Sequence, residues 1–236
     1  MRYTRLGNES AAYMTRREEL RQAEIDLMRQ REHVAQLRRN LPPGPTVRDY
    51  VFKEGPADLD AGDTPARDVR LSELFTGTDR PVVVYHFMFG KKEKTPCPMC
   101  TLWIDGFDGV AHHIKQNVDF AIVAAADLPG LRAYARNRGW RNLRLLSAGD
   151  SSFKYDLTSE DAEGNQDSTI SVFTRDPEGK VRHFYTAHPS MAEDIPERGL
   201  DLLCPVWNLL DLTPKGRGDW YSAVTYPDGA RRAALR

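Results

Sequence analysis

The sequence lacks long hydrophobic runs, and this absence argues against one class of protein. None of its apolar stretches approaches the ~20 residues that a membrane-spanning helix requires. The opening stretch, MRYTRLGNES, carries charge but no apolar segment follows it, so we expect no secretory signal. These absences predict a cytoplasmic protein that has no membrane partner.

Cysteine and net charge are scarce too. Three cysteines are too few for a framework of structural disulfides, and a formal net charge of -1 gives no reason to expect nucleic acid as a partner. We find no glycine-rich phosphate loop, paired-carboxylate motif or serine triad, and we expect no cofactor. The chain is 40% hydrophobic and 28% charged, which is typical of a globular protein with a core.

The most informative motif that is present is Cys97-Pro98-Met99-Cys100. It follows the most apolar run, 81–89, and precedes a segment predicted to be helical, 101–114. A helix N-terminus carries partial positive charge, which favours a thiolate, and proline suits the first helical position. A second thiol three residues on lies on the same helical face and can close a disulfide with the first. A strand, a Cys-x-x-Cys pair and a helix in this order predict a redox site.

Within this pair we predict Cys97 as the nucleophile and Cys100 as the resolving thiol. The lysines just before the motif should favour the Cys97 thiolate further; they are Lys91, Lys92 and Lys94. Two alternatives remain open, namely an incidental pair of core cysteines and a metal site. A metal requires more ligands, and His112 and His113 would lie about 18 Å along the helix from Cys100. We therefore predict no metal ligands.

Several other residues near the motif are predicted to be structural. His86 in the apolar strand and the third thiol, Cys204, are expected to be buried in the core. The aromatic side chains of Trp103 and Phe107 are expected to be core residues as well. The acidic residues of the same helix, Asp105 and Asp108, are expected to be surface charges.

Alternation of strands and helices follows along the chain. We predict short strands and turns over 46–80. Strands are then predicted at 82–89, 118–126 and 143–146, and helices between them at 101–114 and 128–138. After a polar loop over 147–168, a hairpin is predicted from strands 169–175 and 181–186 around Asp176-Pro177-Glu178-Gly179, and then a helical region over about 192–211. The order β-α-β-α-β-β-α predicts the thioredoxin topology.

The N-terminal part differs from the rest in composition. Residues 10–40 contain neither glycine nor proline and predict one long amphipathic helix, whose apolar stripe comprises Leu20, Ala23, Leu27, Val34 and Leu37. The Pro-rich stretch 41–45 ends it. We expect a helical arm over 1–45, a domain over 46–212 and an irregular tail over 213–236. The arm either packs on its own domain or pairs across a homodimer.

Six segments carry a family resemblance, and they are Arg38-Arg39-Asn40-Leu41-Pro42, Tyr85-His86-Phe87-Met88-Phe89, Cys97-Pro98-Met99-Cys100, Asp105-Gly106-Phe107-Asp108-Gly109, Arg138-Gly139-Trp140 and Leu210-Asp211-Leu212-Thr213-Pro214-Lys215-Gly216-Arg217. Together they resemble a thioredoxin-like bacterial family, domain of unknown function 899, over roughly 15–220. More distantly, 145–155 and 172–182 resemble peroxiredoxins of the alkyl hydroperoxide reductase type.

The chain departs from both distant relatives. Thioredoxins carry a cis-proline before the first strand of the hairpin, where this chain has Asp167-Ser168-Thr169. Peroxiredoxins place a threonine three residues before the reactive cysteine, whereas Thr95 is two before Cys97.

The sequence thus predicts an α/β, thioredoxin-like fold, a central mixed sheet flanked by helices, with an N-terminal helical arm. The predicted function is thiol-disulfide oxidoreduction through Cys97 and Cys100, with a protein or small-molecule thiol or disulfide as substrate. One alternative is a thiol-dependent peroxidase of peroxiredoxin type. Another is a non-catalytic binding or metal-handling module.

Overall fold

The chain divides into two units, and the boundary between them lies between Pro43 and Gly44 in the sequence. The computed structural model describes residues 4, 6–195 and 198–225. No helix in these described ranges is long and apolar enough to cross a membrane. The predicted division into 1–45, 46–212 and 213–236 stays a prediction.

The first unit consists mainly of α1 (Ala11–Arg39), which confirms the predicted long helix. Ser10 begins it as the N-cap, since its hydroxyl accepts a hydrogen bond from the Tyr13 N–H at 3.2 Å. None of the residues of α1, all of which are described, is buried. Leu20, Leu27 and Leu37 of the predicted stripe are more than half exposed.

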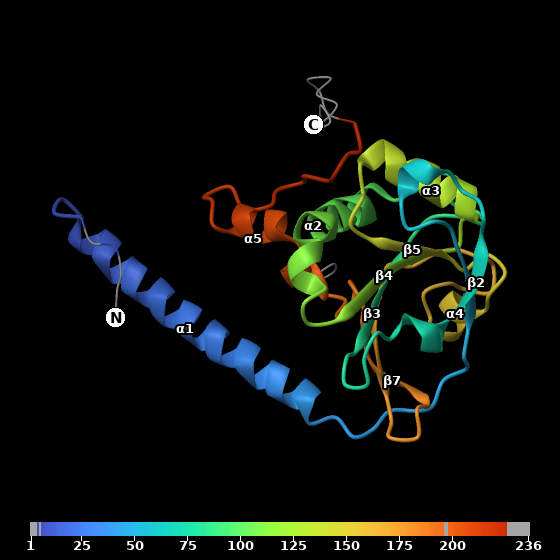
Figure 1. Cartoon of the computed structure of the whole chain (residues 1–236). Coiled ribbons are helices and arrows are strands. Elements are labelled where there is room, and N and C mark those ends of the chain that lie inside the picture. Colours follow the sequence, from blue (N-terminus) through green and yellow to red (C-terminus); the bar gives the residue numbers. More distant parts are fainter. Residues whose placement is uncertain (1–3, 5, 196–197, 226–236) are drawn as a thin grey trace. The chain divides into compact units, whose positions relative to one another are not determined.

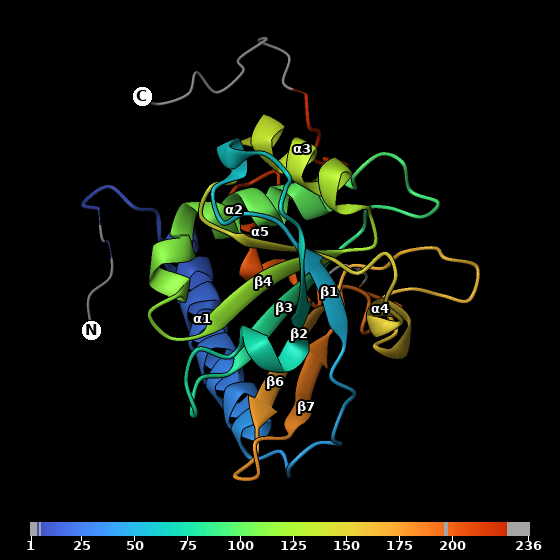
Figure 2. The ribbon, with the colours of Figure 1, turned by 45° about the vertical axis from the view of Figure 1, so that its right-hand side comes forward.

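The second unit contains, within its described residues, a seven-stranded mixed sheet (Figures 1 and 2). In spatial order its strands are β2 (Arg67–Arg70), β1 (Val51–Glu54), β5 (Arg144–Ser147), β4 (Asp119–Ala124), β3 (Val82–Phe87), β6 (Ile170–Arg175) and β7 (Val181–Ala187). The three strands β3, β4 and β5 are parallel, and the others pair antiparallel. The strands β3 and β4 lie in the middle because they are apolar on both faces.

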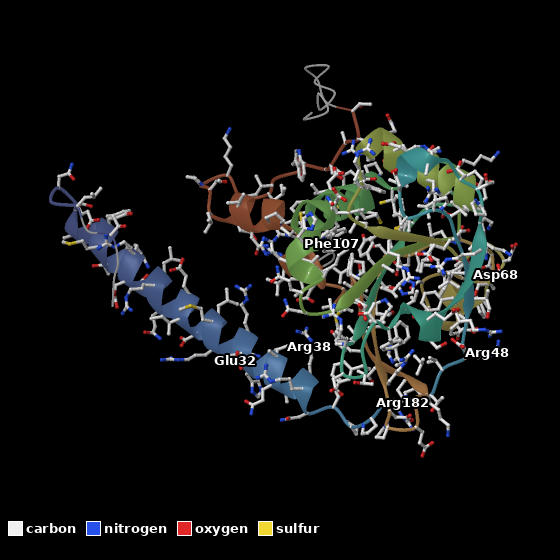
Figure 3. All side chains as sticks on the ribbon, in the orientation of Figure 1. Glu32, Arg38, Arg48, Asp68, Phe107 and Arg182 are labelled. Atoms are coloured by element: carbon white, nitrogen blue, oxygen red, sulfur yellow. The ribbon has the colours of Figure 1, made fainter. Side chains whose placement is uncertain are left out.

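Helices cover one face of this sheet. They are α2 (Pro98–Ile114), α3 (Leu128–Arg138) and α5 (Pro205–Asp211), and Figure 1 shows α2 and α3 over the central strands. The connection from β3 to β4 runs through α2, and the connection from β4 to β5 runs through α3 in the same direction across the sheet. Because such parallel crossovers are right-handed almost without exception, α2 and α3 lie on the same face. Phe107 of α2, labelled in Figure 3, packs its ring 5.5 Å from Tyr85 and 5.1 Å from Phe120. The predicted core positions of Phe107 and Trp103 are confirmed.

The other face is covered by short elements. They are the 3₁₀ helix η2 (Leu71–Leu74) and the single turn α4 (Phe153–Asp156), and their apolar side chains form a second core cluster with Val82 and Val84. A further 3₁₀ turn, η1 (Leu59–Ala61), contacts α3. Two covered faces and a mixed sheet confirm the predicted thioredoxin-like α/β fold.

The structure corrects several predicted elements. The helix after the cysteine motif begins at Pro98 and not at residue 101, because the first cysteine is its N-cap. The predicted loop 147–168 contains α4. Among the described residues of the predicted helix over 192–211, helical structure is confined to η3 (Asp201–Leu203) and α5. Before them, the Gly199 N–H donates a 2.8 Å hydrogen bond to the Pro189 carbonyl, which is not a helical pairing.

The prediction that Asp105 and Asp108 are surface charges is wrong. The Asp105 carboxylate pairs with Arg138 and accepts a 2.7 Å hydrogen bond from the Trp140 indole N–H. Asp108 accepts a 2.8 Å hydrogen bond from the Asn142 backbone N–H. These two carboxylates attach α2 to the end of α3 and to the segment between α3 and β5, whose residues come close to α2 only in the folded chain.

Candidate active site

Cys97 stands at the N-cap of α2, where the loop after β3 ends. Its own N–H donates to the Met88 carbonyl at 3.1 Å, which holds the cysteine against the end of the strand. Pro98 occupies the first turn of the helix, as predicted, because that position needs no N–H. The Cys97 sulfur accepts a hydrogen bond from the Cys100 N–H at 3.4 Å. The side chain therefore acts as the helix cap, in the way that serine or aspartate does elsewhere.

Hydrogen bonds favour the ionised form of Cys97. They lower the pKa of the Cys97 thiol to about 6; the largest effect is the hydrogen bond with the Cys100 thiol, and burial opposes it. Smaller effects come from the backbone N–H groups of Cys100 and Met99 and from the Tyr221 hydroxyl. The predicted lysines are not among these groups, and Lys91 forms an ion pair with Glu160 instead.

Cys100 lies one helical turn deeper and has no exposed surface. Burial raises the pKa of the Cys100 thiol well above its ordinary value, and the hydrogen bond and charge of Cys97 raise it further. Hydrogen bonds with the Tyr85 hydroxyl and the Met88 N–H act in the opposite direction. Both cysteines are free thiols in this structure. The two sulfurs therefore form an asymmetric pair, in which the outer thiol ionises first.

Two buried polar side chains lie near Cys100, and the sequence analysis missed both. Burial and the neighbouring Cys100 raise the pKa of Tyr85 well above its usual value. The buried Tyr85 hydroxyl acts on the Cys100 thiol as a hydrogen-bonding group, and Ser168 acts on Tyr85 in the same way and lowers its pKa.

The second missed side chain is Lys154 of α4, which is only 1% exposed. Its ammonium donates a 3.0 Å hydrogen bond to the carbonyl of Phe87, the last residue of β3. Burial lowers the pKa of Lys154 to about 8, and the negative charge of Cys100 is the first of the effects that oppose this. Lysine is almost never fully buried without a partner, and its neighbours in the sequence read as a polar loop, so no local signal indicated its burial.

The remaining predicted residues have structural places. His86 is confirmed as a buried core histidine, because its Nε2 lies 3.0 Å from the Ser171 hydroxyl and its ring stacks on Phe153 at 5.1 Å. Cys204 is confirmed as a buried cysteine at the start of α5, and burial raises its pKa. Across the described residues, no group of three His, Cys, Asp or Glu side chains could hold a metal ion.

A cavity of about 490 Å³ lies far from the cysteines along the sheet. It is lined by the first residues of β3, β4 and β5, which are Val82, Asp119 and Arg144. The carboxylate of Asp119 there pairs with Arg80 at 3.3 Å, and Arg144 pairs with Glu54 at 2.6 Å. Ligands of open α/β sheets bind at the carboxyl ends of the strands, and the cysteine pair, not this cavity, lies at that end.

Comparisons with solved structures find peroxiredoxins. The chain is similar to reduced Prx3 of Vibrio vulnificus in complex with hydrogen peroxide, at 17% identity and a TM-score of 0.43 over 69% of this chain and 94% of that one. It is similar to AhpC of Mycobacterium tuberculosis at 14% identity and a TM-score of 0.46, over 69% of this chain and 89% of that one. It is similar to AhpC of Enterococcus faecalis at 10% identity and a TM-score of 0.45, over 77% of this chain and 98% of that one.

A search among curated proteins found no match to this sequence. A family model matches residues 4–229, and it is described as a bacterial protein of unknown function, DUF899. Since this match spans nearly the whole chain and includes the cysteine motif, the chain belongs to the DUF899 family.

Proposed function

We propose that the protein is a thiol-disulfide oxidoreductase that uses Cys97 and Cys100. The observation that carries the proposal is the placement of the two thiols: the half-buried Cys97 sulfur caps α2 and accepts the Cys100 N–H at 3.4 Å, whereas Cys100 is fully buried one turn deeper. In keeping with this placement, the pKa of Cys97 is lowered to about 6 and the pKa of Cys100 is raised. At pH 7 about nine tenths of the Cys97 thiols would be ionised, and the thiolate is the nucleophile in disulfide exchange.

The reaction has two steps. The Cys97 thiolate attacks one sulfur of a substrate disulfide, forms a mixed disulfide and releases the other sulfur as a thiolate. Cys100, once ionised, attacks the Cys97 sulfur, releases the second substrate thiolate and closes the Cys97–Cys100 disulfide. The substrate gains two electrons and the protein loses two, so an external dithiol must reduce the pair again.

The first step prepares the second. The hydrogen bond and the charge of the Cys97 thiolate raise the pKa of Cys100. Both are lost when Cys97 enters the mixed disulfide, because its sulfur is then neutral and bonded. The pKa of Cys100 should then fall, and the nearby Lys154 ammonium and Tyr85 hydroxyl favour the new thiolate. Cys100 thus becomes reactive only after a substrate has been captured.

A protein or small-molecule disulfide is the substrate class that this chemistry serves. The cytoplasmic location expected from the sequence belongs to the proposal as an expectation. Pairing of α1 across a homodimer stays one of the two alternatives for the helical arm.

A thiol-dependent peroxidase is a second candidate. It is favoured by the partial burial of Cys97, because a small peroxide reaches a half-buried thiolate more easily than a folded protein does. In this reaction the Cys97 thiolate attacks one peroxide oxygen and the O–O bond breaks; the other oxygen leaves as hydroxide or alkoxide and takes up a proton, and Cys97 becomes a sulfenic acid. Cys100 then displaces water from it and closes the same disulfide.

Two assays run side by side test the proposal. Purified protein is supplied with dithiothreitol, and the reduction of insulin and the consumption of hydrogen peroxide are measured. We expect insulin reduction that is lost in Cys97→Ser and kept in Cys204→Ala, the matched control at the other buried thiol. Peroxide consumption without insulin reduction would overturn the proposal in favour of the peroxidase.

A further inference from the structure

The C-terminal segment 219–225, called the strap below, lies on the first turn of α2. Ser222 is only 7% exposed, and its hydroxyl contacts the Met99 sulfur, inside the cysteine motif, at 3.9 Å. Further along, the Arg138 guanidinium donates a 3.2 Å hydrogen bond to the Val224 carbonyl. Arg138 is itself fixed by its ion pair with Asp105 of α2. The strap is therefore attached to α2 directly, through Ser222 and Met99, and indirectly, through Val224 and Arg138.

The strap is anchored at its other end as well. The Trp220 ring packs edge-on against Trp207 of α5, with centroids 5.3 Å apart. Arg217, just before the strap, lies 4.9 Å over the same Trp207 ring and pairs with the Asp201 carboxylate at 2.7 Å. Tyr221 stands between these two anchors, so its backbone position is fixed from both sides.

Tyr221 reaches the reactive sulfur. Its side chain is 55% exposed. Its two chain neighbours are held on the first turn of α2 and on α5, and its hydroxyl acts on Cys97 as a hydrogen-bonding group that lowers the pKa of the thiol. We propose that Tyr221 is a catalytic residue, whose hydroxyl stabilises the Cys97 thiolate while the strap partly covers the sulfur. The inference rests on the proposed role of Cys97 as nucleophile. It extends the candidate site to a part of the chain that the sequence predicted to be an irregular tail.

The chemistry of the first step gives the hydrogen bond its use. A hydroxyl bonds a thiolate more strongly than a neutral disulfide sulfur, since hydrogen bonds to charged groups are roughly twice as strong as neutral ones. Tyr221 therefore stabilises the state that waits for substrate. The hydrogen bond between Tyr221 and Cys97 weakens when Cys97 becomes part of a disulfide. The reaction with a substrate therefore loosens the hold of the strap on the sulfur.

The test compares full-length variants by the rate at which iodoacetamide alkylates Cys97 between pH 4 and pH 10. The midpoint of this profile reports the pKa of Cys97, and the plateau at high pH reports access to the sulfur. Tyr221→Phe removes only the hydroxyl from an exposed ring, so the fold should be kept. We expect the midpoint to rise by up to about one unit. Tyr155→Phe, at an exposed tyrosine of α4, is the matched control and should leave it unchanged.

A second variant displaces the strap without shortening the chain. Ser222→Glu places a charge at a buried position and should release the strap from Met99. We expect the same rise in midpoint and, because the sulfur is uncovered, a higher plateau. An unchanged midpoint in Tyr221→Phe would overturn the inference, whatever Ser222→Glu does. Disulfide reduction is measured in parallel: a shifted midpoint without turnover would reject the proposed function alone, and turnover without the shift would reject the strap alone.

Discussion

Two helices of the second unit begin with the same dipeptide, a cysteine as N-cap followed by a proline. Cys97-Pro98 begins the 17-residue α2, and Cys204-Pro205 begins the 7-residue α5. The Cys97 sulfur accepts a hydrogen bond from its helix, whereas the Cys204 side chain makes no capping hydrogen bond. The pKa of Cys97 is lowered to about 6 by hydrogen bonds, and the pKa of Cys204 is raised by burial.

This difference shows that a helix N-terminus does not by itself activate a thiol. At Cys97 the backbone, at φ -60° and ψ 124°, turns the sulfur toward the first N–H groups, and a second thiol adds the largest hydrogen bond. At Cys204, with 1% exposure, burial raises the pKa and outweighs the backbone N–H groups of Val206 and Trp207, which act in the opposite direction. The balance between burial and the second thiol therefore decides the chemistry.

The largest expected effect separates the two thiols directly. With limiting iodoacetamide at pH 7, Cys97 should be alkylated at least about tenfold faster than Cys204. The pKa of Cys97 is lowered to about 6 and that of Cys204 is raised, so a far larger share of Cys97 is thiolate at pH 7. The lower nucleophilicity of a low-pKa thiolate offsets part of this advantage. The Cys97 rate should fall as the pH drops through about 6, because the thiolate is then protonated. Peptide mass spectrometry gives both rates, and faster labelling of Cys204 would reverse the comparison.

Removing the second thiol should make Cys97 resemble Cys204 more closely. Cys100→Ala deletes the hydrogen bond that lowers the pKa of Cys97 most, while the backbone N–H groups remain. We expect the midpoint of the Cys97 alkylation profile to rise by about one unit. Cys204→Ala is the matched control and should not move it. A midpoint that stays near pH 6 would show that the backbone groups alone suffice.

A smaller effect is expected from the buried charge near Cys100. Lys154→Met keeps the length of the side chain and removes the ammonium that favours the Cys100 thiolate. The mixed disulfide at Cys97 should then persist several-fold longer at pH 7, which rapid quenching and mass spectrometry can measure. The control is Lys180→Met in the exposed turn of the β6–β7 hairpin, where the lysine pairs only with Glu178 among described residues. An unchanged lifetime of the mixed disulfide would show that Lys154 does not favour the Cys100 thiolate.

Local sequence patterns predicted the parts of this site that depend on neighbours along the chain. The bounds of α3 were predicted as found, because Asp127 caps its start and Gly139 ends it with φ 78°. The cysteine pair and the buried His86 follow from short apolar and helical patterns. Lys154 and Tyr221 could not be predicted, since they lie 54 and 121 residues from Cys100 and reach it or Cys97 only through the tertiary fold. Asp105 was misjudged for the same reason, because its partners Arg138 and Trp140 belong to another element.

The smallest effect on the thiols is expected from the first unit. Deleting residues 1–41 should leave the alkylation midpoint of Cys97 unchanged, because none of the groups that act on its pKa belongs to α1. If α1 pairs across a homodimer through its exposed leucines, light scattering should report half the mass of the full-length protein. An unchanged mass would contradict that pairing, and a shifted midpoint would show that residues 1–41 affect the pKa of Cys97.

The most direct test of the central claim is the capture of a mixed disulfide in Cys100→Ser. Without the resolving thiol, the variant should attack a disulfide substrate once and retain half of it. The account predicts, after brief exposure to oxidised glutathione at pH 7, one glutathione adduct on Cys97 by peptide mass spectrometry, and no adduct in Cys97→Ser. An adduct on Cys204, or release of the substrate from Cys100→Ser as fast as from the unmodified protein, would contradict it.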